Sequence, residues 1–139
     1  MRILLIFSIF LLDFLISSKL SSPNPNAYKI VAKIRDDLAD GIDSKNKTAL
    51  EEVLFDVYTF DMCRGARSSF NRSQIIEHMM KTKVKVQPFA IEKIPYSDED
   101  LIVLISWTKT SKGPKQYFRH TIRRDDEKYR IFHSNKMNC

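Results

Sequence analysis

The chain has 139 residues, of which 43% are hydrophobic and 29% are charged, and its formal net charge is +6. These proportions are typical of one globular domain and exclude a disordered chain, which has low hydrophobicity and high charge. The chain contains only 3 glycines and 5 prolines, which excludes a collagen-like or Pro/Gly-rich sequence. The sequence contains no repeat with a period of roughly 20 to 50 residues, which excludes a solenoid or a propeller.

The first 18 residues have the pattern of a secretory signal peptide. Arg2 precedes an apolar stretch of about ten residues, and small residues follow it. We expect cleavage after Ser18, with Ser22 as a later alternative. A retained membrane anchor is the competing interpretation, but Asp13 interrupts the stretch, and a spanning helix needs about 20 mostly apolar residues.

Export would divide the chain into a signal peptide (1–18), an exposed leader (19–26) and one secreted, extracellular domain (27–139) without a membrane anchor. Two sequons agree with this prediction. Asn46-Lys47-Thr48 and Asn71-Arg72-Ser73 both have the Asn-x-Ser/Thr pattern without proline, so we expect N-linked glycosylation at Asn46 and Asn71.

Two cysteines, Cys63 and Cys139, occur in the chain. In an oxidising compartment they would most simply form one disulfide, which would close a loop of about 77 residues and attach the C-terminus to the domain. A free thiol, or an intermolecular bridge through Cys139, is the alternative. The two cysteines and three histidines lack the spacing of metal ligands, so we expect no metal and no cofactor.

Three helices are predicted in the first half of the domain. Apolar residues at helical spacing indicate an amphipathic helix over 27–40, which Gly41 ends. Residues 48–51 (TALE) match a capping box at the start of a second helix. The third helix, expected over 74–81, would be capped by one of two polar residues, Asn71 or Ser73.

One strand is predicted before the third helix and four after it. Residues 55–63 are rich in aromatic and β-branched residues and indicate a strand, and 64–69 indicate a loop. The chain from residue 83 onward is predicted to be wholly β, with strands over 83–94, 101–107, 115–124 and 128–134. Helices followed by an antiparallel meander are typical of an α+β fold.

The segment from Leu101 to Trp107 is apolar at six of its seven positions. This pattern predicts a central strand that is buried on both faces, or a strand with one exposed face used for association. We expect a second copy of the chain to cover the face that the core does not use, which would give a homodimer.

The last two strands are rich in lysine and arginine, and alternation places Tyr117, Arg119, Thr121 and Arg123 on one face. Such a face could meet nucleic acid, a sulfated glycan or an anionic membrane. Secretion argues against nucleic acid. The plainer interpretation is a solvated basic face that keeps sheet edges from pairing.

The order and lengths of these elements resemble the nuclear transport factor 2-like superfamily, also called the cystatin-like cone fold. Three segments show the resemblance: LADGID at 38–43, ALEEVLFD at 49–56 with Phe60-Asp61 continuing it, and RSQII at 72–76. The resemblance covers roughly residues 27–135 and implies a curved antiparallel sheet that forms a conical cavity around a long first helix. The chain resembles secreted members of unknown function that are frequent in nematodes. A cystatin inhibitor is the alternative, but its pattern has one helix and a Gln-x-Val-x-Gly loop that this chain lacks.

Asp61 and His120 are the candidates for an acid or base inside such a cone. In ketosteroid isomerases of this superfamily the base is an aspartate at the position that resembles Asp61, and a tyrosine stands on the first helix where this chain has Ile34. Isomerase chemistry therefore lacks its electrophilic partner. Otherwise Asp61 is a solvated carboxylate at a strand end, and His120 is a hydrogen-bonded core residue on the same strand face as Phe118 and Ile122.

These observations predict a secreted single-domain protein that binds a small ligand or an extracellular protein partner, without catalysis and without nucleic acid. The alternative is a small-molecule isomerase, lyase or cyclase that uses an acid or base in the cone cavity.

Overall fold

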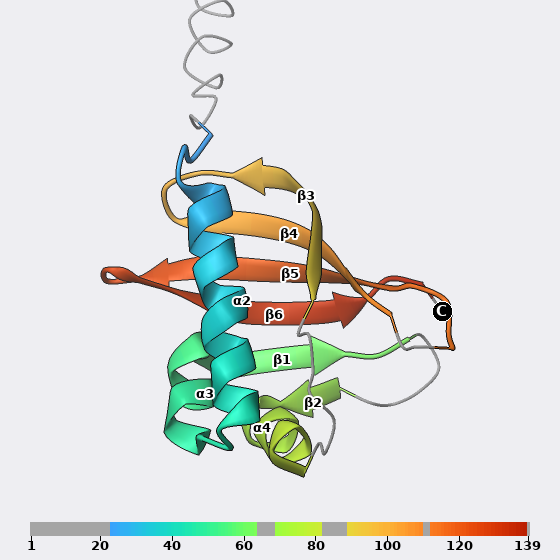
Figure 1. Cartoon of the computed structure of the whole chain (residues 1–139). Coiled ribbons are helices and arrows are strands. Elements are labelled where there is room, and N and C mark those ends of the chain that lie inside the picture. Colours follow the sequence, from blue (N-terminus) through green and yellow to red (C-terminus); the bar gives the residue numbers. More distant parts are fainter. Residues whose placement is uncertain (1–22, 64–68, 82–88, 110–111, 139) are drawn as a thin grey trace, which may run out of the picture.

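The computed structural model describes residues 23–63, 69–81, 89–109 and 112–138. This part of the chain forms three helices and one six-stranded sheet (Figure 1). The helices are α2 (Ala27–Asp43), α3 (Lys47–Val53) and α4 (Arg72–Lys81). The strands are β1 (Leu54–Asp61), β2 (Ser69–Asn71), β3 (Ala90–Ser97), β4 (Leu101–Thr108), β5 (Gln116–Asp125) and β6 (Lys128–Lys136).

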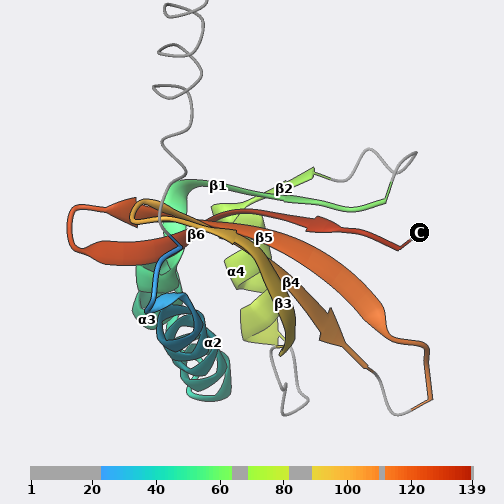
Figure 2. The ribbon, with the colours of Figure 1, turned by 90° about the horizontal axis from the view of Figure 1, so that it is seen from above.

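The order of strands across the sheet is β2-β1-β6-β5-β4-β3. β1 runs parallel to β6, and every other neighbouring pair is antiparallel. The sheet curves without closing, and the helices lie on its concave side (Figure 2). The predicted α+β class and curved sheet are therefore confirmed, and all three described helices lie on one face of the sheet.

The apolar positions of α2 face the core as its periodicity predicts, because Val31, Ile34 and Leu38 are all buried. We expected the helix to end at Gly41, but it continues to Asp43. A Cβ atom on Gly41 would lie 2.8 Å from Leu50 Cδ2 of α3. The glycine therefore allows α2 and α3 to approach closely and does not terminate the helix.

Asparagine side chains cap the two shorter helices. Asn46 Oδ1 accepts a hydrogen bond of 3.1 Å from the Ala49 amide, so α3 begins before the TALE segment and the capping box expected there is wrong. Asn71 Oδ1 accepts from the Gln74 amide at 3.0 Å, and Gln74 Oε1 accepts from the Asn71 amide at 2.9 Å. Of the two caps considered for α4, Asn71 is therefore the one used, in a reciprocal arrangement.

Ser69, predicted as the last residue of a loop, begins the short edge strand β2, which was not predicted. This strand pairs antiparallel with β1, with Phe70 opposite Phe60, and the two ring centroids lie 6.4 Å apart. Three residues are too few to show a strand period in the sequence. The part of the predicted 83–94 strand before residue 89 lies outside the described residues, and β3 begins at Ala90.

β4 lies between β3 and β5 and is buried on both faces, as predicted. Ile102 and Leu104 belong to the core on the helical side. Val103 and Ile105 alternate with them on the other face, and each is only 8% exposed. Neighbouring strands thus already cover most of the second face of β4 within one chain.

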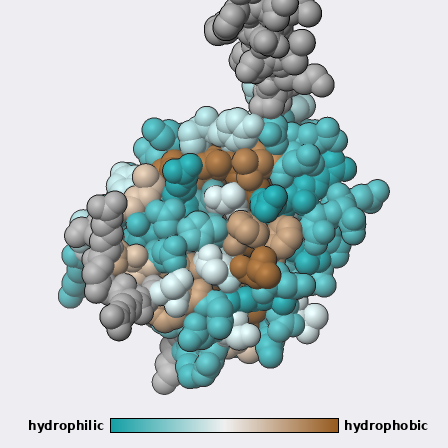
Figure 3. All heavy atoms as spheres, turned by 180° about the vertical axis from the view of Figure 1, so that it is seen from behind, coloured by the Kyte–Doolittle hydropathy of each residue, from teal (hydrophilic) through white to brown (hydrophobic). Residues whose placement is uncertain are grey.

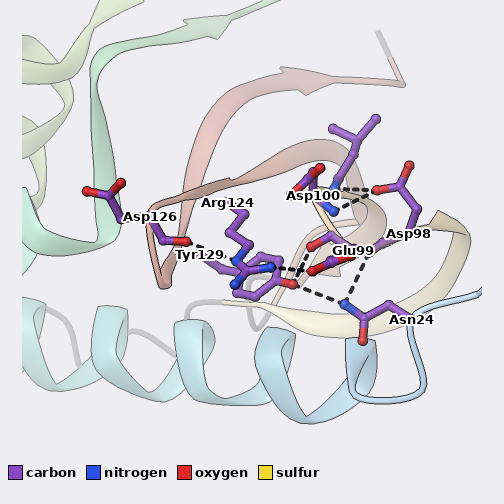
Figure 4. Close-up of polar contacts among 8 residues, drawn as sticks. Asn24, Asp98, Glu99, Asp100, Arg124, Asp126 and Tyr129 are labelled. Carbon is purple, nitrogen blue, oxygen red and sulfur yellow. Dashed lines mark hydrogen bonds and ion pairs between the residues drawn. The ribbon is translucent and has the colours of Figure 1, made fainter.

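The segment before α2 is attached to the sheet through Asn24 (Figure 4). The Asn24 amide side chain donates to the Asp98 carbonyl at 3.1 Å and to the Tyr129 hydroxyl at 3.2 Å. Arg124 holds the same β3–β4 loop through Glu99 at 2.8 Å. Residues from Asn24 onward are therefore part of the fold. The predicted signal peptide and its cleavage site lie outside the described residues, and among the described helices none is long and apolar enough to cross a membrane.

Candidate functional site

A cavity of about 300 Å³ lies on the concave side of the sheet, between β1, β4, β5, β6 and the helices. Most of its wall is apolar, and the main apolar contributors are Leu38, Leu54, Phe60, Met79, Phe89 and Phe118. The rings of Phe89 and His120 pack in a tilted arrangement, with 5.3 Å between their centroids. A mostly apolar hollow with few polar groups is the usual form of a small-molecule site.

Polar side chains also line this wall. Ser106, His120 and Ser134 form one hydrogen-bonded chain, with Tyr58 beside it, and the remaining polar lining residues are His78, Thr108, Gln116 and Lys136. His120 Nε2 lies 2.8 Å from Ser106 Oγ of β4, and His120 Nδ1 lies 2.7 Å from Ser134 Oγ of β6. Tyr58 of β1 lies beside Ser134, which lowers the pKa of its hydroxyl against the larger effect of burial. Ser106, His120, Ser134 and Tyr58 come from four strands that are adjacent in the sheet, and all of them line the cavity.

Burial sets the protonation of this network. The pKa of His120 is lowered to about 4, first by desolvation and then by repulsion from His133. Burial also raises the pKa of Tyr58 to about 12. At neutral pH both groups are uncharged, so His120 has one donor and one acceptor nitrogen.

Counting hydrogens shows what the network can offer to a ligand. The hydroxyls of Ser106 and Ser134 and one neutral imidazole supply three hydrogens, and the two hydrogen bonds between them use two of these. One hydrogen is therefore not used by these two bonds.

The structure places Asp61 outside this cavity. Tyr58 and Phe60 line the hollow, so the alternation of β1 directs Asp61 to the opposite face. Its carboxylate is half exposed, accepts from Ser69 Oγ at 2.6 Å, and lies 3.6 Å from His133 Nε2. Of the two catalytic candidates, only His120 reaches the cavity.

Ile34, at the position where the resemblance implies a tyrosine in isomerases, is a buried core residue. Among the described residues, no cluster of three or more histidine, cysteine or acidic side chains could hold a metal ion.

The two sequon asparagines are exposed on the helical side of the molecule. Each uses its Oδ1 atom to cap a helix, which leaves Nδ2, the atom to which an N-linked glycan is attached. Capping and glycosylation therefore do not compete for the same atom. Glycosylation at Asn46 and Asn71 stays a prediction.

Cys63 lies beside the C-terminal end of the chain. Its sulfur is 3.8 Å from the carbonyl oxygen of Asn138, and Asp61 pairs with Asn135 where β1 and β6 end together. The proximity that a disulfide would require of these strand ends is thus present. Cys139 itself lies outside the described residues, so the disulfide stays a prediction.

A wider groove of about 620 Å³ lies outside the cone, between α2, α3 and the turn that joins β5 to β6. Charged side chains along it pair with one another, as Lys33 does with Asp37 at 2.6 Å and Lys128 with Glu52 at 2.8 Å. We favour the smaller cavity as the functional site, because its polar groups are buried and directed at the hollow.

The sequence did not point to Ser106, Ser134 or Tyr58 as site residues. In the sequence, each is a polar residue on an otherwise apolar strand face, and no other feature of the sequence marks it as a site residue. His120 was considered, but its two serine partners lie 14 residues away on either side.

A curved, open sheet with helices on its concave side defines the nuclear transport factor 2-like, or cystatin-like, fold. An NTF2-like protein of unknown function from Silicibacter pomeroyi is similar with a TM-score of 0.65 and 12% identity, over 79% of this chain and 93% of that one. An NTF2-like protein from Cytophaga hutchinsonii gives 0.62 and 11%, over 81% and 98%. A domain of unknown function with a cystatin-like fold from Nostoc punctiforme gives 0.61 and 10%, over 84% and 79%.

These comparisons confirm the resemblance at the level of the fold. No protein-family model matches the chain, and no curated protein matches it either. At such low identities the shared fold carries no information on ligand or activity.

Proposed function

We propose that this protein is an extracellular binding protein for a compact, mostly apolar molecule that carries one hydrogen-bond acceptor. The observation that supports this most is the buried polar group of Ser106, His120, Ser134 and Tyr58 in the wall of a mostly apolar cavity. Buried polar groups that retain a free donor are costly unless a partner satisfies them.

The size and charge of the cavity define the ligand class. A volume of about 300 Å³ is at the lower end for ligand pockets, so the ligand is compact. His120 is uncharged at neutral pH, so the buried network offers a neutral donor to a carbonyl or a hydroxyl group, while Lys136 also lines the cavity.

Binding is favoured over catalysis by the same network. A general base works best with a pKa near the working pH, whereas the pKa of His120 is about 4 and that of Tyr58 about 12. Both ring nitrogens of His120 are also engaged by serine hydroxyls.

The extracellular location is supported by the signal-like start, by two exposed sequons, and by Cys63 beside the C-terminal end. These features are independent of the cavity, so a failure to bind ligand would leave this part of the proposal standing.

Binding can be tested with prodan, a compact neutral naphthalene fluorophore that carries one ketone oxygen as a hydrogen-bond acceptor. We expect its fluorescence to rise on mixing with the protein, and we expect Met79→Trp, which fills the cavity, to abolish the rise. Met137→Trp is the matched control, because Met137 is 49% exposed and lies outside the cavity. Binding that survives Met79→Trp, or no binding by the unaltered protein, would contradict the proposal.

A further inference from the structure

The face of the sheet opposite the described helices carries a cluster of cations, and we name it the outer face. Figure 3 shows this face, with a hydrophobic band among predominantly hydrophilic side chains. The strand registers place on it the alternating residues of β5 together with their partners on β3, β4 and β6. Its defining residues are Lys93, Ile105, Trp107, Lys115, Tyr117, Arg119, Thr121, Arg123 and Phe132.

The apolar residues of the outer face are mostly covered within one chain. Ile105 pairs with Lys93 on one side and Arg119 on the other, and it is 8% exposed. Lysine and arginine stems can cover apolar surface while their charges stay in water. The apolar stretch of β4 therefore does not by itself require a second copy, and the homodimer stays a prediction.

Four cations of the outer face differ from those on the helical side in forming no ion pair with the described residues, whereas Arg130, the register partner of Arg123, lies 3.9 Å from Asp125 and 4.0 Å from Glu52. On the helical side, Lys33 pairs with Asp37 and Arg72 with Asp56. Within the described ranges, no carboxylate forms an ion pair with the four outer-face cations: Lys93, Lys115, Arg119 and Arg123. Glu92 is the carboxylate that lines the shallow groove beside Lys93 and Arg119.

Aromatic rings hold two of these cations in place. Lys115 Nζ lies 4.0 Å from the centroid of the Trp107 ring, and the Arg123 guanidinium lies 5.0 Å from that of Phe132. Such contacts orient a cation without neutralising its charge. Lys115 and Arg123 are therefore ordered and keep their positive charge, while Asp61 and Asp125 lie toward the ends of the same face.

The cations along β5 form a line. A cation occurs at every fourth residue: Lys115, Arg119 and Arg123. In an extended strand neighbouring cations are about 13 Å apart, and the distance from Lys115 to Arg123 is about 27 Å. A row of this length matches a linear polyanion better than a single small anion.

We propose that the outer face binds a sulfated polysaccharide that lies along β5. Lys115 covers a face of the Trp107 ring, which makes this ring a poor platform for stacking nucleic-acid bases. The outer face is convex (Figure 2), so a flat membrane would contact only part of the row. Both sequon asparagines lie on the helical side, so their glycans would leave the outer face accessible.

The test uses a fluorescently labelled heparin oligosaccharide and the purified full-length secreted protein at 150 mM NaCl. We expect Arg119→Gln/Arg123→Gln to weaken binding on the order of tenfold or more, because two fewer counterions are released per complex. The slope of log affinity against log salt should fall by about 2. The control Lys29→Gln/Lys33→Gln removes the same charge from α2 and should change affinity less than twofold.

Equal losses in the two variants would mean that only net charge matters, and would overturn the proposal. Unchanged binding by the β5 variant would overturn it too. Single-stranded DNA of equal charge that competes as well as heparin would contradict the assignment to a sulfated glycan. Circular dichroism melts of all variants establish that the comparison concerns folded protein, and the readout does not depend on the cavity.

Discussion

Ser106 on β4 and His120 on β5 share a hydrogen bond of 2.8 Å at a place where both side chains are buried. The bond joins two of the strands that form the cavity wall. It therefore contributes both to the stability of the sheet and to the polar part of the candidate site.

Ser106→Ala removes one partner of the His120 imidazole and leaves a buried ring nitrogen unsatisfied. We expect a loss of about 1–2 kcal/mol in the free energy of unfolding, measured by urea denaturation. Ser44→Ala is the control, because the Ser44 hydroxyl is exposed and water can replace its bond to the Asp40 carbonyl; it should cost less than about 0.5 kcal/mol. Equal effects from the two variants would show that the buried bond adds nothing.

Stability should fall as pH decreases through the range in which His120 titrates. The pKa of His120 is lowered from 6.5 to about 4 in the folded protein, so below pH 6.5 the unfolded chain binds a proton that the folded chain does not. The contribution is complete above pH 6.5 and is lost between pH 6.5 and 4, and it amounts to about 3 kcal/mol. Urea midpoints across this range measure it.

His120→Phe should remove this pH dependence, because phenylalanine does not titrate. Phenylalanine is chosen because the side chain at this position packs against two aromatic rings, those of Phe89 and Phe118. His78→Gln on the exposed side of α4 should retain it. A wild-type slope that persists in His120→Phe would assign the effect to another group.

Gly41→Ala should destabilise the packing of α2 against α3. The new Cβ would lie 2.8 Å from Leu50 Cδ2, and Leu50 is completely buried. We expect a net loss of about 1–2 kcal/mol, because overpacking outweighs the gain of about 1 kcal/mol in helix propensity. In a Leu50→Ala background the same change should be neutral or stabilising; destabilisation in both backgrounds would exclude the steric explanation.

Cys63 and Cys139 should be joined in the secreted protein. Non-reducing peptide mapping should find the two peptides linked, and reduction should cost about 4 kcal/mol if the bridge is unstrained. Alkylation of Cys63 without reductant in folded protein would disprove the intramolecular bridge and would make Cys139 a candidate for linking chains.

The secreted protein should begin between Ser18 and Pro23 and carry a glycan on Asn46. Asn24 is built into the fold through Asp98 and Tyr129, so cleavage beyond it would remove stabilising contacts. N-terminal sequencing and glycosidase treatment measure both features. Secreted material that starts at Met1 would refute the first, and an unmodified Asn46 would refute the second.

Patterns within about 15 residues of the chain were enough to predict the α+β class, the buried stripe of α2 and the double burial of β4. Such patterns depend only on the 3.6-residue and 2-residue periods of side chains around a helix or along a strand. The order of elements also resembled the fold that the structure shows.

The tertiary structure alone decided the pairing of β2 with β1, the role of Gly41 and the outward direction of Asp61. It also brought Tyr58 to Ser134 and Ser106 to His120. These relationships join residues on different elements, and no local period encodes them. Whether a polar side chain in an apolar strand finds a partner depends on which strands become neighbours, and this is settled only when the sheet assembles.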